Sequence, residues 1–97
     1  MPRVLFNISY AIKPVHREKY LSLVKELKTH LAGSKDYAVF EVNGKKNHFT
    51  EVYTAQSMEE YDALEDNQDE KTQELLSRIQ ECVDDKGMKY STLVEAG

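Results

Sequence analysis

Residues 48–66, HFTEVYTAQSMEEYDALED, join an alternating segment to a helical one through a very short turn. Apolar and polar side chains alternate over 48–55, which predicts a β-strand with two different faces. Ser57 and Glu60 have the spacing of a capping box, so a helix is expected to begin there. The apolar stripe expected on this helix is Met58, Tyr61 and Leu64. The short turn therefore predicts a helix that folds back over its own strand.

The segments before this unit predict two more strands and a helix. Residues 4–12 alternate as a first strand, and Pro14 opens a helix whose apolar positions recur at helical spacing until Gly33. Residues 36–42 predict a second strand, and the Asn43-Gly44 pair after it is a strong hairpin signal. The strand at 48–55 is expected to return antiparallel to it.

After the helix at Ser57, the stretch 65–71 is expected to interrupt the helical region. A longer helix follows, with Leu75, Leu76, Ile79 and Val83 facing inward, and Gly87 ends it. Residues 88–96 then predict the last strand. The order strand, helix, strand, strand, helix, strand is that of the ferredoxin-like α+β fold, with one antiparallel sheet and its helices on one face. Residues 1–97 are expected to form one such domain.

The hairpin sets the two faces of this sheet. A short turn at Asn43-Gly44 pairs even positions of one strand with odd positions of the other, and so predicts one face made of Ala38, Phe40, Val42, Phe49, Glu51 and Tyr53. The opposite face then holds Tyr37, Val39, Thr50 and Val52. Both faces contain apolar residues, whereas the helices can cover only one of them. The other face is expected to be an exposed aromatic patch, which a homodimer would cover.

In element order and length the chain resembles the dimeric α+β-barrel superfamily, particularly its antibiotic-biosynthesis monooxygenase-like domains. The resemblance is most specific over residues 49–66, where these domains often have an aromatic strand with Glu-x-Trp followed by a helix rich in Glu, Ala and Leu. Here the strand reads Glu51-Val52-Tyr53, so tyrosine replaces tryptophan, and the histidine common in the helix is missing near Leu64. The resemblance implies two sheets packed face to face in a dimer.

Asn7 matches an asparagine on the first strand of the haem-degrading branch of this superfamily. That branch also requires a tryptophan and a histidine on the second helical segment, and residues 60–76 contain neither. The sequence therefore excludes haem degradation.

Composition excludes several other classes of function. A net charge of −4 without a basic stripe argues against nucleic-acid binding. The chain has no glycine-rich phosphate loop, no Ser/His/Asp pattern and no CxxC, and its three histidines are too dispersed for a metal site. No metal, cofactor or membrane partner is expected. The single cysteine, Cys82, favours a reducing compartment, so a cytoplasmic location is expected.

Three residues are the candidates for catalysis. Glu51 would abstract a phenolic or enolic proton if burial raised its pKa, Tyr53 would act as a hydrogen-bond donor or acid–base group, and Asn7 would polarise a substrate oxygen. The alternatives are an ion pair for Glu51, packing for Tyr53 and a backbone hydrogen bond for Asn7. The candidate ligand-binding residues are Phe40, Phe49 and His16.

Two functions remain open from the sequence. In one, the protein is a cofactor-independent oxygenase that binds a small phenol, quinol or enol between sheet and helices. In the other, it is a non-enzymatic dimeric module that binds a small molecule or a partner protein.

Overall fold

The computed structural model describes residues 2–33, 35–66 and 68–97, apart from the side chains of 64–66. Its elements follow the predicted order, and their bounds are β1 Val4–Ala11, the 3-10 helix η1 Pro14–His16, α1 Arg17–Leu31, β2 Asp36–Glu41, β3 His48–Ala55, α2 Met58–Asp66, α3 Glu70–Cys82 and β4 Lys89–Val94. The four strands form one antiparallel sheet in the order β2-β3-β1-β4. The predicted ferredoxin-like α+β fold is therefore confirmed.

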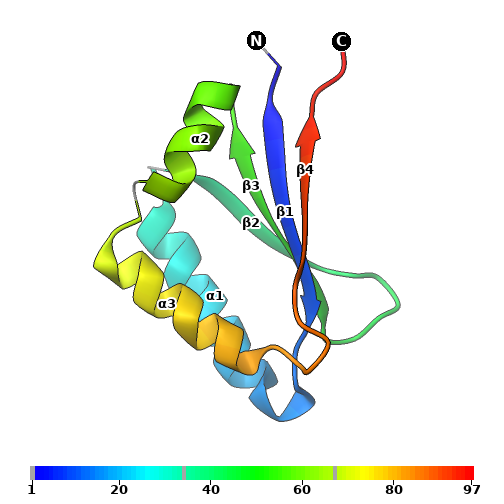
Figure 1. Cartoon of the computed structure of the whole chain (residues 1–97). Helices are drawn as coiled ribbons and strands as arrows, with labels where there is room; N and C mark the ends of the chain where they lie inside the picture. The colour runs from blue at the N-terminus through cyan, green and yellow to red at the C-terminus, as the bar shows by residue number, and fades with distance from the viewer. Residues whose placement is uncertain (1, 34, 67) are drawn as a thin grey trace.

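The helices lie on one side of this sheet (Figure 1). Helices α1 and α3 pack side by side, and α2 sits near the end of β3 from which it emerges. One polar link joins the end of α1 to the start of α3: Asp69 accepts the Thr72 backbone N–H at 2.7 Å as a helix cap, and His30 Nε2 lies 2.9 Å from Asp69 Oδ2. The core fills the space between these helices and the sheet, and its helical members include Tyr20, Leu23, Leu27, Leu75 and Ile79.

The predicted cap of α2 is confirmed. Ser57 Oγ accepts the Glu60 backbone N–H at 3.2 Å, and the Glu60 carboxylate accepts the Gln56 backbone N–H at 2.9 Å. The predicted buried stripe is wrong at Met58, which is 46% exposed because it lies in the first turn, beyond the helix face that packs on the sheet. The side chain of Leu64 lies outside the described part of the chain.

The predicted faces of the hairpin are wrong. Odd residues of β2 pair with odd residues of β3, as in Tyr37 with Tyr53 and Val39 with Glu51. The reason is the length of the connection: the Val42 backbone N–H donates to the His48 carbonyl at 2.8 Å, which leaves an odd number of residues, 43–47, in the loop. Gly44 and Asn47 adopt positive φ angles of 82° and 69° there, the left-handed conformation that Gly and Asn accept most easily.

The corrected register also changes the open face, the side of the sheet without helices. Phe40 lies there at 58% exposure, across the sheet from Phe49, Glu51 and Tyr53. The other open-face positions are aliphatic or polar, namely Leu5, Asn7, Ser9, Ala11, Asp36, Ala38, His48, Thr50, Val52, Thr54, Lys89, Ser91 and Leu93. The expected aromatic patch on this face is therefore wrong, because Tyr37, Phe49 and Tyr53 of the hairpin lie under the helices and only Phe40 lies on the open face.

Candidate functional site

Glu51 lies in the middle of β3 on the side of the sheet that the helices cover. Its side chain is 1% exposed. Tyr37 of β2 donates its hydroxyl to Glu51 Oε1 at 2.5 Å, and Tyr10 of β1 donates to Oε2 at 2.7 Å. Both strands beside β3 thus contribute one phenol to the same carboxyl group. We call Glu51, Tyr10, Tyr37 and Tyr20 the buried carboxyl network.

Tyr20 connects this network to the helical layer. Its hydroxyl lies 2.7 Å from the Tyr10 hydroxyl, and its ring meets the Phe49 ring at a centroid distance of 4.5 Å. The Arg17 guanidinium lies 5.7 Å from the Phe49 ring centroid and forms an ion pair with Glu41 at 2.7 Å. Its ion pair therefore lies outside the buried carboxyl network. No lysine, arginine or histidine of the described chain forms an ion pair with Glu51.

The surroundings of Glu51 control its protonation. Burial raises the pKa of the Glu51 carboxyl, and the hydrogen bonds from Tyr37 and Tyr10 offset part of that rise because they stabilise the anion. Burial, followed by the charge of Glu51, raises the pKa of the Tyr10, Tyr37 and Tyr53 phenols. The phenols therefore stay protonated at neutral pH, and Glu51 is the group of this set that can take up a proton.

Tyr53 joins the network to a second group of rings. Its ring lies 4.8 Å from Tyr37 and 6.2 Å from Phe6, and Phe6 in turn lies 6.0 Å from Tyr61 of α2 and 6.1 Å from Tyr90 of β4. We call Phe6, Tyr53, Tyr61 and Tyr90 the outer aromatic cluster. Tyr90 is 62% exposed, so this cluster runs from the buried carboxyl network to the solvent. Among the described residues nothing hydrogen-bonds to the Tyr53 hydroxyl.

The structure brings together two of the three catalytic candidates. Glu51 and Tyr53 share the helix-covered face, whereas Asn7, which pairs with Val52, points to the open face. Asn7 Oδ1 is buried and has no hydrogen-bond partner in the described part of the chain. Asn7 therefore lies apart from Glu51 and Tyr53, because odd residues of β1 share the face of the even residues of β3.

The ligand-binding candidates also lie in different parts of the structure. Phe49 is buried on the same face as Glu51, and Phe40 lies on the opposite face. His16 is half-buried at the N-terminus of α1, and no described contact joins it to the buried carboxyl network. Sequence reasoning missed Tyr10 and Tyr37, the two donors to Glu51. The alternation of β1 places Tyr10 with Phe6 and Ile8, and the correct loop length would have placed Tyr37 beside Tyr53.

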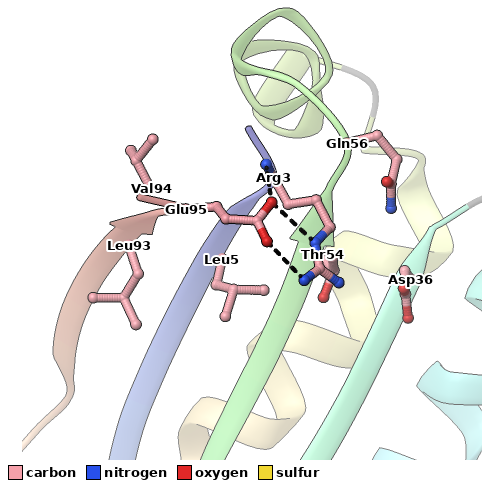
Figure 2. Close-up of a pocket in the computed structure, with 8 residues that line it drawn as sticks. All are labelled: Arg3, Leu5, Asp36, Thr54, Gln56, Leu93, Val94 and Glu95. Carbon is pink, nitrogen blue, oxygen red and sulfur yellow. Dashed lines mark hydrogen bonds and ion pairs between the residues drawn. The ribbon is translucent and has the colours of Figure 1, made fainter. Parts of the chain in front are cut away.

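The open face has a hollow at each end. Figure 2 shows the one beside the chain termini, about 310 Å³ in volume, where Arg3 forms an ion pair with Glu95 at 3.0 Å. Asp36, Thr54 and Leu93 also line it, so its charged groups are of both signs. The second hollow lies at the other end of β1, beside the loop 42–47.

The described residues contain no group of three or more His, Cys, Asp or Glu side chains placed to hold a metal ion. None of the described helices is long and apolar enough to cross a membrane.

Solved structures share this fold, although no family model and no curated protein matches the sequence. A conserved protein from Methanosarcina mazei Go1 superposes with a TM-score of 0.80 at 17% identity, over 99% of this chain and 95% of that one. A conserved protein of unknown function from Bacteroides thetaiotaomicron, named a possible oxidoreductase, gives 0.74 at 22% identity, over 96% and 97% of the two chains. An antibiotic biosynthesis monooxygenase gives 0.68 at 17% identity, over 97% of both chains.

These similarities define the fold class. The chain has the ferredoxin-like fold of antibiotic-biosynthesis monooxygenase-like domains, as the resemblance over residues 49–66 implied. At these identities the similarity extends to the fold alone, and the chemistry depends on the residues of the site.

The raised pKa of Glu51 makes stability depend on pH. In the unfolded chain this carboxyl ionises near pH 4.3, whereas the folded protein holds it protonated to a higher pH. Its stabilising contribution is therefore full below about pH 4.3 and is lost as the pH rises through the raised pKa. Glu51→Gln cannot ionise, so the unfolding free energy of the variant minus that of the wild type should increase over this window. Urea unfolding between pH 4 and 9 measures this difference.

Glu81→Gln removes an exposed carboxylate from α3 and serves as the matched control, for which the difference should stay flat. A flat difference for Glu51→Gln as well would mean that Glu51 ionises as readily in the folded protein as in the unfolded chain.

Proposed function

We propose that the protein is a cofactor-independent oxygenase for a small phenol, quinol or enol that binds against the outer aromatic cluster. The observation that carries this proposal is the continuity between a buried carboxyl group of raised pKa and an aromatic surface that reaches the solvent. The monooxygenase name of one structural neighbour and the possible oxidoreductase name of another support the same class of chemistry.

The reaction needs little from the protein. A phenolate or enolate is electron-rich enough to reduce O2 directly, and one oxygen atom then enters the ring while the other leaves as water. For a simple phenol the balance is phenol plus O2 giving quinone plus water. The protein has to bind the ring, accept the first proton and keep bulk water away from the intermediate.

The position of each residue determines its proposed role in the reaction. Glu51 is the proton acceptor, and the proton reaches it through Tyr37, whose hydroxyl already donates to Glu51. Tyr53 lies beside Tyr37, and its hydroxyl is available to donate a hydrogen bond to the substrate oxyanion. The rings of Phe6, Tyr61 and Tyr90 provide the flat apolar surface for the substrate. Asn7 has no part in this proposal, since it lies on the other face.

Oxygen uptake with a panel of phenols, quinols and enols tests the proposal. Glu51→Gln should lower kcat about a hundredfold, the lower end of a general base contribution, and leave ligand affinity within a few fold. Tyr53→Phe should lower kcat by a smaller factor, and Glu81→Gln is the control expected to match the wild type. Binding can be measured independently by titrating the tyrosine fluorescence of each variant.

Absence of oxygen uptake with every compound, or equal activity of Glu51→Gln and the wild type, would contradict this proposal. A second function would then apply, namely a non-enzymatic ligand-binding module. One observation favours it: both Glu51 oxygens already accept tyrosine hydrogen bonds, so the network is complete without a substrate. Ligand binding without turnover, unchanged in Glu51→Gln, would identify this function.

We also propose that two copies pack through their open faces. Phe40 and Leu93 are exposed on that face, and every residue of β4 is exposed. A second sheet would bury these side chains and could supply a donor to the unpartnered Asn7 Oδ1. The resemblance to the dimeric α+β-barrel superfamily supports the same arrangement.

Phe40→Glu should therefore convert a homodimer of twice 11.2 kDa into a monomer, because it places a charge within the proposed interface. Val15→Glu, at an exposed apolar residue of η1 away from the open face, is the control and should remain dimeric. Light scattering at micromolar concentration measures both masses. A monomeric wild type, or a Phe40→Glu variant that stays dimeric, would refute this interface.

A further inference from the structure

The hollow at the loop end of the open face is basic. It has a volume of about 260 Å³. Its charged and polar lining residues come from β1, β3, β4 and two loops, namely Ser9, Lys45, His48, Thr50, Lys86 and Lys89. The loop before β3 and the loop before β4 lie at the same end of the sheet (Figure 1). Segments far apart in the sequence thus bring three lysines to one place.

This concentration of positive charge is unusual for a chain with a net charge of −4. No acidic residue lines the basic hollow, although Asp84 and Asp85 precede Lys86 directly. Within the described chain the ammonium groups of Lys45, Lys86 and Lys89 form no ion pair, whereas Lys19 and Lys71 on the helices both do. The hollow at the opposite end differs, because there Arg3 is neutralised by Glu95. The three lysines therefore line one hollow that has no acidic residue in its lining.

A hydroxyl pair lies at the same place. Ser9 Oγ and Thr50 Oγ1 are 3.0 Å apart across the β1–β3 pair. In such a pair one hydroxyl hydrogen forms the link, and the other remains to donate elsewhere. Since lysines and hydroxyl groups both donate hydrogen bonds to phosphate oxygens, the hollow combines charge and directional donors for an oxyanion.

We propose that the basic hollow binds a doubly charged oxyanion of the phosphate class, either inorganic phosphate or a small phosphate monoester. Three lysine charges match a dianion better than a single carboxylate. The volume, slightly below the usual range for ligand pockets, limits the organic part to a small group lying against Ala11 and Val42. The strand side chains Ser9 and Thr50 of this hollow lie on the face opposite Glu51, and none of the rings of the outer aromatic cluster lines it.

Titration of the 15N-labelled protein by NMR tests the proposal, with inorganic phosphate, phenyl phosphate and acetate in separate arms and sodium chloride at matched ionic strength as the reference. Saturable shifts of the Ser9, Thr50 and Gly87 amides are expected with both phosphates and not with acetate. Tighter binding of phenyl phosphate would identify a monoester as the ligand, and equal binding would identify free phosphate.

The triple variant Lys45→Gln, Lys86→Gln and Lys89→Gln should weaken phosphate binding at least tenfold. The matched control replaces Lys25, Lys28 and Lys71 on the helices by Gln, with the same change of net charge, and should bind within twofold of the wild type. If the first triple variant does not fold, Lys89→Gln alone, at an exposed strand residue, should weaken binding at least threefold.

Three results would overturn the proposal. Shifts that do not saturate would show general ionic association, as would equal weakening in the two triple variants. The third result has two parts: the variant of Lys45, Lys86 and Lys89 changes the mass of the assembly, and phosphate shifts no amide signal of the wild type. It would show that these lysines take part in the contact between copies.

Discussion

A carboxyl group enclosed by a sheet and a helical layer has to find hydrogen-bond donors inside the protein. Glu51 has no cation beside it within the described residues, and its two donors are the phenols of Tyr10 and Tyr37 on the neighbouring strands. An unpaired buried charge is costly, so burial raises the pKa of the Glu51 carboxyl, and the two phenol hydrogen bonds offset part of that rise. The helices pack over Glu51, and Tyr20 of α1 extends the hydrogen-bonded chain through its bond with the Tyr10 hydroxyl. The registers of β3 with β1 and of β3 with β2 therefore meet at one side chain.

The same register gives the two faces of the sheet different properties. Aromatic rings gather under the helices, where Tyr53 and Phe6 continue the buried carboxyl network toward Tyr90 and the solvent. The open face carries small aliphatic and hydroxyl side chains, with hollows at its ends. Proton transfer suits the first face because it is dry and holds a group of raised pKa. Contact with a second copy and binding of an anion suit the second face, where Phe40 and the side chains of β4 are exposed.

Local signals in the sequence were sufficient for the elements and for the fold. Alternation in β1 and β3, the Ser57 cap and the break before α3 all lie within short windows, where periodicity and capping chemistry act directly. The face of the sheet on which each residue of β2 lies depended instead on the number of residues in the loop between β2 and β3. Asn43-Gly44 indicates a turn but not its length, and the loop 43–47 reverses the parity that a shorter turn would impose. That single difference moved Tyr37 beside Glu51 and Phe40 to the open face. Glu51 and Tyr53 could be predicted as a pair, whereas the donors to Glu51 required the three-dimensional register.

The protonation state of Glu51 is the property on which the proposed chemistry depends most directly. A pH titration of the Glu51 side-chain carboxyl by 13C NMR reports that state in the folded protein, with Glu51→Gln used to assign the signal. The account predicts a midpoint clearly above the ordinary glutamate value of about 4.3, as expected for a buried group that can hold a substrate proton. A midpoint at or below that value would show a carboxylate stabilised as the anion by Tyr10 and Tyr37, and would contradict its role as the proton acceptor.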